Sequence, residues 1–101
     1  VRHYPQTGGG FVVGVLDLDR FKPVNDIYGH ATGDQLLTEV GIRLQSISSD
    51  TVLVGRLGGD EFGLLIDGDD TAAKVIGDHV ITLLHRPFQI DGHHLSIGCS
   101  I

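Results

Sequence analysis

Two short apolar segments, separated by two glycines and two acids, dominate the middle of the sequence. Residues 51–57 and 62–66 are rich in valine, leucine and isoleucine, and residues 58–61 between them read Gly-Gly-Asp-Glu. Apolar runs of this length on either side of a glycine pair predict a β-hairpin. Gly58 and Gly59 have no Cβ atoms, so an anion can approach their backbone N–H groups closely.

Asp60 and Glu61 place two carboxylates beside this anion site. Like charges next to a phosphate repel one another unless a cation lies between them, and oxygen ligands favour Mg²⁺. A second acidic segment, Asp17-Leu18-Asp19, also ends an apolar run. A solvated acidic turn is the alternative interpretation of residues 60 and 61 alone. Two acidic segments at strand ends favour a metal-dependent phosphate site.

The N-terminal part of the chain predicts one strand and one short helix. The nearly continuous apolar run 11–18 is typical of a strand buried on both faces. Gly8–Gly10 before it predicts a flexible loop. Pro23 permits a short helical turn that Gly29 ends.

The remaining segments complete a mixed α+β pattern. Apolar residues at helical spacing predict amphipathic helices ending near residues 47 and 85, the first of them opened by a capping box at 32–35. Residues 88–90 and 94–101 predict a final hairpin. The order β-α-β-β-α-β with this added hairpin predicts a ferredoxin-like antiparallel sheet with helices packed on it.

Composition limits the classes of protein to which the chain can belong. A chain of 101 residues supports one domain, 1–101, and the net charge of −6 argues against nucleic acid as a partner. No apolar run is long enough to cross a membrane, so we expect no membrane contact by this segment. The only cysteine, Cys99, lies in an apolar strand, which predicts a buried structural thiol. A single cysteine allows no internal disulfide and fits a reducing compartment, so we expect a cytoplasmic location, in a parent protein that can itself be anchored to a membrane.

Residues 58–62 (Gly-Gly-Asp-Glu-Phe) are the signature of GGDEF domains, the diguanylate cyclases. Residues 16–34 resemble the second motif of that family along their whole length. The segment 86–92 (Arg-Pro-Phe-Gln-Ile-Asp-Gly) resembles GGDEF domains that are fused to EAL phosphodiesterases. The resemblance runs from about residue 11 to the end of the chain, and it implies a palm-type fold.

The resemblance implies two Mg²⁺ ions in each active site, for which Mn²⁺ can substitute. The implied oxygen ligands are Asp17, the carbonyl of Leu18, Asp60 and Glu61. Asp60 also matches the position that activates the attacking ribose 3′-hydroxyl, although the sequence leaves open which carboxylate accepts the proton. Asp17 has the alternative role of a strand-end carboxylate in a turn, and we interpret Asp19 as structural.

Two cationic side chains flank these acids. Lys22 matches the lysine of the family's Phe-Lys pair, where a cation stabilises negative charge on the transferring phosphate; an ordinary surface lysine is the alternative. Arg56 can reach a phosphate or form a cross-strand ion pair, and the sequence does not decide between them.

The resemblance implies that Asn25 and Asp34 read guanine. A carboxylate accepts hydrogen bonds from guanine N1–H and N2–H₂ together, and adenine has no such pair of donors, so Asp34 favours GTP over ATP. Asp34 can also stabilise the first turn of a helix. His30 can pack under the nucleotide or contact it, and Gly58 and Gly59 are expected at the phosphates.

The chain departs from the family pattern in two ways. Many members have an Arg-x-x-Asp product-inhibition site, whose positions are Ser49 and Val52 here, so tight feedback binding is not expected. The family's helix before the first strand and its segment beyond residue 101 are not matched. We therefore expect a domain truncated at both ends, which alone can be inactive.

The leading hypothesis is a diguanylate cyclase that condenses two GTP molecules into cyclic di-GMP and two pyrophosphates across a homodimer, in a parent protein with a sensor or an EAL domain attached. The alternative is a catalytically silent GTP-binding module that regulates such an attached domain. The missing arginine fork disfavours a third possibility, a cyclic di-GMP receptor.

Overall fold

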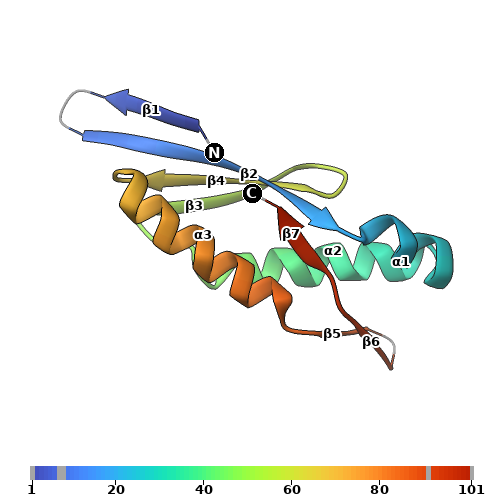
Figure 1. The fold of residues 1–101 in the computed structure, drawn as a ribbon. Coiled ribbons are helices and arrows are strands. Elements are labelled where there is room, and N and C mark those ends of the chain that lie inside the picture. The colour runs from blue at the N-terminus through green and yellow to red at the C-terminus, as the bar shows by residue number, and fades with distance from the viewer. Residues whose placement is uncertain (1, 7–8, 91, 101) are drawn as a thin grey trace.

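The computed structural model describes residues 2–6, 9–90 and 92–100. Its elements in chain order are β1 (Arg2–Gln6), β2 (Gly9–Asp19), α1 (Phe21–Tyr28), α2 (His30–Gln45), β3 (Val52–Gly58), β4 (Glu61–Asp67), α3 (Asp70–His85), β5 (Phe88–Ile90), β6 (His93–Leu95) and β7 (Gly98–Ser100). Helices α2 and α3 cover one face of an antiparallel sheet (Figure 1), which confirms the predicted α+β class. No helix in the described ranges is long and apolar enough to cross a membrane.

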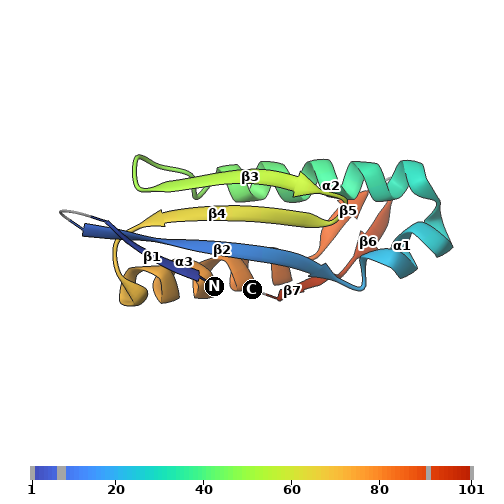
Figure 2. The same ribbon diagram turned by 90° about the horizontal axis from the view of Figure 1, so that it is seen from above.

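The long strand β2 organises the sheet. One of its edges pairs antiparallel with β4, which in turn pairs with β3. Its other edge is shared by β1, near the start of β2, and by β7, near its end. The predicted central hairpin is confirmed as β3–β4. Seen from above, β3, β4 and β2 lie side by side over the helices (Figure 2).

Burial along β2 alternates, so the prediction of a strand buried on both faces is wrong. Val12 and Leu16 are fully buried against the helices, whereas Val15 is 41% exposed on the opposite face. Antiparallel sheets commonly have one such open face. The predicted loop at Gly8–Gly10 is also wrong for its described part, because Gly9 and Gly10 pair with β1; Gly8 lies outside the described residues.

Two residues with positive φ separate β2, α1 and α2. Arg20 has φ 63°, a left-handed conformation uncommon for a residue other than glycine, and it turns the chain from β2 into α1. Gly29 has φ 93°, and its N–H donates to the carbonyl of Asn25 at 2.9 Å, which closes α1. Helix α2 then begins directly at His30, two residues before the predicted capping box.

The C-terminal segment differs from the predicted single hairpin. Strand β5 pairs with a short β6, and the chain then crosses to β2, where β7 places Cys99 opposite Leu18. Burial raises the pKa of the Cys99 thiol above its ordinary value, and the nearby charge of Asp19 raises it further. A thiol that keeps its proton fits the predicted structural role.

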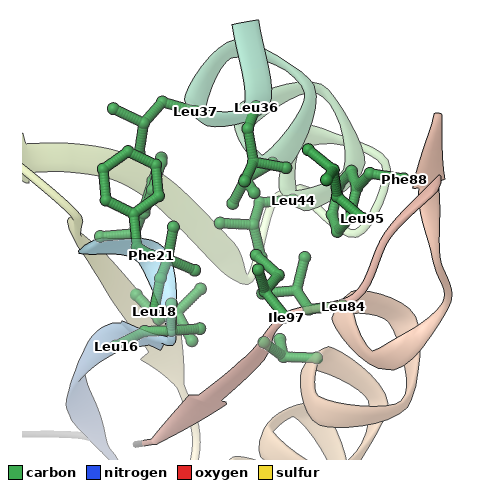
Figure 3. Packing of buried hydrophobic residues seen from close by; sticks show 14 of the residues in the cluster. Leu16, Leu18, Phe21, Leu36, Leu37, Leu44, Leu84, Phe88, Leu95 and Ile97 are labelled. Carbon is green, nitrogen blue, oxygen red and sulfur yellow. The ribbon is translucent and has the colours of Figure 1, made fainter. Parts of the chain in front are cut away.

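The hydrophobic core lies between β2, β4 and the helices, and the C-terminal strands close it (Figure 3). Its largest fully buried side chains include Leu16, Leu36, Leu44, Leu84, Phe88 and Ile97. Arg43 of α2 fastens one end of this core. Its guanidinium lies 3.5 Å from the centre of the Phe88 ring and donates to the carbonyls of Leu83, Arg86 and Pro87.

Candidate active site

The acidic residues of the two motifs meet where β2 ends. The β2–β4 register places Asp17 directly opposite Glu61, and both side chains are exposed. Directly opposite residues of an antiparallel pair point to the same face, where like charges destabilise the pair. The backbone N–H of Leu18 donates to the carbonyl of Asp60 at 3.2 Å, which joins the turn to the end of β2.

The Gly58–Gly59 turn is shaped by its backbone. The β3–β4 register shifts between Arg56 and Gly58, so β3 has one extra residue there, a β-bulge. Gly58 has φ 151° and Gly59 has φ 51°. A Cβ atom on either glycine would meet nothing within 4 Å. The space over the turn is therefore open, and the backbone angles are what favour glycine.

Arg56 belongs to this turn, which neither interpretation of the sequence anticipated. Its Nε and Nη2 atoms donate to the carbonyl of Gly59 at 3.1 and 2.9 Å. The side chain thus holds the hairpin's own backbone, where we expected a phosphate contact or a cross-strand ion pair. No side-chain pattern in the sequence indicates this contact, because its acceptor is a backbone carbonyl.

The residues expected to read guanine lie at the junction of α1 and α2. Asn25 is half-buried against the first turn of α2: a Cβ atom on Gly33 would come within 1.7 Å of its Oδ1 atom. Asp34 follows Gly33 and is exposed. Only glycine at position 33 lets the Asn25 side chain lie there, beside the residue that precedes Asp34.

Lys22 and His30 are both exposed, at the starts of α1 and α2. Figures 1 and 2 both show this helix pair at the end of the sheet that carries the β3–β4 turn. The structure therefore brings both motifs to one end of the molecule. The roles of Lys22 and His30 stay predictions.

A groove of about 450 Å³ lies between α2 and the β3–β4 hairpin. Its lining includes Leu37, Gly41, Ile42, Val54, Arg56 and Phe62. Sequence reasoning missed it, because its walls come from segments that are apart in the chain. A Cβ atom on Gly41 would lie 3.9 Å from the Phe62 ring, in ordinary van der Waals contact, so the groove would also accept alanine at this position. The groove is mostly apolar and adjoins the turn through Arg56.

The donor set at the end of β2 fits Mg²⁺, because carboxylate and carbonyl oxygens are its usual ligands. Among the described residues, however, no three His, Cys, Asp or Glu side chains gather closely enough to hold a metal ion by themselves. Mg²⁺ is commonly held by one or two carboxylates together with waters and substrate phosphates, which agrees with the exposed Asp17 and Glu61 and the half-buried Asp60 around an open turn. The metal role of Asp17, Leu18, Asp60 and Glu61 stays a prediction.

The positions of the family's product-inhibition site form a small turn instead. Ser49 and Val52 exchange backbone hydrogen bonds, at 2.9 and 3.3 Å. The hydroxyl of Ser49 lies 3.2 Å from that of Thr51, and Val52 is 3% exposed. Neither side chain can make the bidentate contacts of an arginine fork.

Comparisons with known proteins agree with these motifs. The family model described as "Diguanylate cyclase, GGDEF domain" matches residues 2–101. The chain is 42% identical over 92 residues to the bifunctional diguanylate cyclase/cyclic di-GMP phosphodiesterase MucR of Pseudomonas aeruginosa, covering 90% of this chain and 13% of MucR. It is 39% identical over 95 residues to the cyclic di-GMP phosphodiesterase NbdA of the same species, covering 93% of this chain and 12% of NbdA.

A solved structure shows the same fold. The crystal structure of a sensory box/GGDEF family protein from Caulobacter crescentus superposes with a TM-score of 0.85 at 40% identity, covering 93% of this chain and 62% of that one. The chain therefore spans a small part of the first curated relatives and the larger part of a known domain structure.

Proposed function

The chain belongs to the GGDEF domain family, and on that premise we propose that it is the cyclase domain of a diguanylate cyclase, which joins two GTP molecules into cyclic di-GMP and releases two pyrophosphates. The observation that supports the proposal is the register that sets Asp17 opposite Glu61, with the Asp60 carbonyl bonded to the next residue of β2, beside an open glycine turn. Both motifs keep their carboxylates.

Each half of the site has its own task in this proposal. The 3′-hydroxyl of one GTP attacks the α-phosphorus of the other, the bond to pyrophosphate breaks, and a carboxylate, which we assign to Asp60, accepts the hydroxyl proton. Asp17, Asp60, Glu61 and the Leu18 carbonyl would hold Mg²⁺, which when bound would supply positive charge to offset the negative charge of the phosphates. Lys22 adds a cation beside the same phosphates.

The α1–α2 junction supplies base selection. Asn25 lies against Gly33, and Asp34 follows Gly33 in α2, just beyond the first turn of that helix. A carboxylate at this place accepts from the N1–H and N2–H₂ groups of guanine, so the site selects GTP. Two protomers that face each other then bring each 3′-hydroxyl to the other's α-phosphate, which makes the active form a homodimer.

One relative favours a second candidate function. NbdA, at 39% identity, is named for phosphodiesterase activity. A domain of this kind can bind GTP and regulate an attached phosphodiesterase without turnover. The retained carboxylates at positions 17, 60 and 61 favour the enzyme.

The test is to incubate the full-length protein, with any attached phosphodiesterase domain inactivated, with GTP and Mg²⁺ and to measure cyclic di-GMP. The control variant is Asp60→Ala. The backbone carbonyls of Asp60 and Gly59 accept the hydrogen bonds that hold the turn, so we expect this variant to keep its fold and lose the product. GTP binding without product in the wild-type protein would establish the regulatory alternative. Turnover by a folded Asp60→Ala protein at the wild-type rate would contradict the role of Asp60.

A further inference from the structure

Both peptide groups that flank Asp60 are held by other parts of the chain. On its N-terminal side, the Gly59 carbonyl accepts from Nε and Nη2 of Arg56 in β3, at 3.1 and 2.9 Å. On its C-terminal side, the Asp60 carbonyl accepts from the N–H of Leu18 in β2, at 3.2 Å. The backbone of Asp60 is thus fixed between two strands, although it lies in an exposed turn.

The arginine contact also fixes the direction of one amide. A trans peptide is planar, with its C=O and N–H groups on opposite sides, and the described chain has no cis peptide bonds. The Gly59 carbonyl points to Arg56, so the Asp60 N–H of the same peptide points the opposite way. The positive φ of Gly59, 51°, is part of this conformation.

Arginine suits this contact better than lysine. Its planar fork places two donors on one carbonyl oxygen, whereas a lysine ammonium is a single flexible point charge. A charged donor on the C=O also polarises the peptide and strengthens its N–H as a donor to an anion. The contact spans the β-bulge between Arg56 and Gly58, where the regular ladder cannot hold the turn.

We infer that Arg56 is a positioning residue of the Gly58–Gly59 turn. It acts through the Gly59 carbonyl, turns the Asp60 N–H outward as a donor to a phosphate, and keeps the Asp60 side chain in place for the reaction. Only the catalytic part of this inference, the placing of the Asp60 N–H and side chain for the reaction, rests on the proposed function. The restraint on the turn itself is a property of the protein without nucleotide.

The experiment compares Arg56→Ala and Arg56→Lys with Arg86→Ala in the full-length protein. Arg86 is an exposed arginine at the C-terminal end of α3, outside the β3–β4 turn, so the control removes the same charge elsewhere. Hydrogen exchange followed by mass spectrometry, without nucleotide, measures the restraint directly. We expect exchange of residues 58–61 and of Leu18 to rise at least tenfold in Arg56→Ala and to stay unchanged in Arg86→Ala. Unchanged exchange in Arg56→Ala overturns the inference, whether or not the protein is a cyclase.

Steady-state kinetics then separate positioning from direct phosphate binding. A misplaced catalytic group lowers kcat, by about 100-fold for a displacement near 1 Å. We therefore expect Arg56→Ala to lose about 10- to 100-fold in kcat with a KM for GTP within about threefold of wild type. Ethylguanidinium should restore part of this loss and ethylammonium should not, since the fork is the required feature. A raised KM with unchanged kcat assigns Arg56 to the substrate instead and overturns the positioning role.

Discussion

Asp17 and Glu61 lie directly opposite each other where β2 pairs with β4, with both carboxylates exposed. An uncharged side chain of similar size, such as asparagine, at either position would remove this repulsion. The arrangement therefore costs stability unless a cation occupies the space beside it. It links metal binding to the stability of the sheet.

Asp17→Asn should stabilise the protein in the absence of divalent ions. Removing one of two opposed charges is worth about 0.5 kcal/mol in the free energy of unfolding. Urea unfolding in EDTA and in Mg²⁺ measures both terms: Mg²⁺ should stabilise the wild type and have little effect on the variant. Asp78→Asn, on the exposed surface of α3, is the matched control and should respond to Mg²⁺ as the wild type does. Equal stabilisation of wild type and Asp17→Asn by Mg²⁺ would remove Asp17 from the ligands.

Asp34→Ala should weaken the binding of GTP far more than the binding of ATP. Each lost hydrogen bond from the guanine edge to a charged acceptor costs roughly 1.5–3 kcal/mol. Calorimetric titrations with the two nucleotides in Mg²⁺ give the ratio of affinities directly, and the triphosphate is common to both. If the preference for GTP survives in the variant, Asp34 does not read the guanine edge.

Arg43→Met should destabilise the protein by roughly 2–3 kcal/mol, because several carbonyls at the end of α3 lose a charged donor. Methionine keeps much of the apolar contact with Phe88 and removes the hydrogen bonds. Denaturant unfolding measures the loss, and Arg86→Met, which removes an exposed arginine nearby, should change stability by less than about 0.5 kcal/mol. Similar losses in both variants would show that Arg43 does not fasten α3 and β5.

Cys99 should react slowly with iodoacetamide, and the rate should keep rising with pH beyond the point at which a free thiol levels off. Burial and the charge of Asp19 raise its pKa, so the folded state holds the proton more tightly than the unfolded chain. Its contribution to stability is therefore complete below about pH 8 and is lost as the pH rises through the folded pKa. Mass spectrometry of the peptide that contains Cys99 gives the rate at each pH, and a plateau at an ordinary thiol pKa would contradict the shift.

Features with a local pattern were predictable from the sequence. The β3–β4 hairpin follows from two apolar runs around Gly58 and Gly59, and α2 and α3 follow from their apolar periodicity. Phe11–Leu18 was correctly predicted as a strand, but its open face was not. Val13 and Val15 are apolar yet lie on the face opposite the helices. A continuous apolar run does not indicate which face of a strand the helices will cover.

Contacts between distant segments could not be predicted in this way. The carbonyls that accept from Arg43 and Arg56 belong to the backbone, which every residue has, so no side-chain pattern indicates them. The same holds for the pairing of β7 with β2, which brings Cys99 to Leu18. In the candidate site, the acids and glycines could be predicted because the residue types alone indicate their chemistry. The arginine that holds their backbone was assigned to other partners.

Strands β1 and β7 come from opposite ends of the described chain and bind the same edge of β2 (Figure 2). In mechanical terms, each end of the described chain is hydrogen-bonded directly to the strand that carries Asp17. Ser100 pairs with Asp17 itself, while β1 holds the other half of the strand. A pull on either strand therefore acts as a shear on β2, and the three residue pairs that join β7 to β2 include Asp17 and Asp19 themselves.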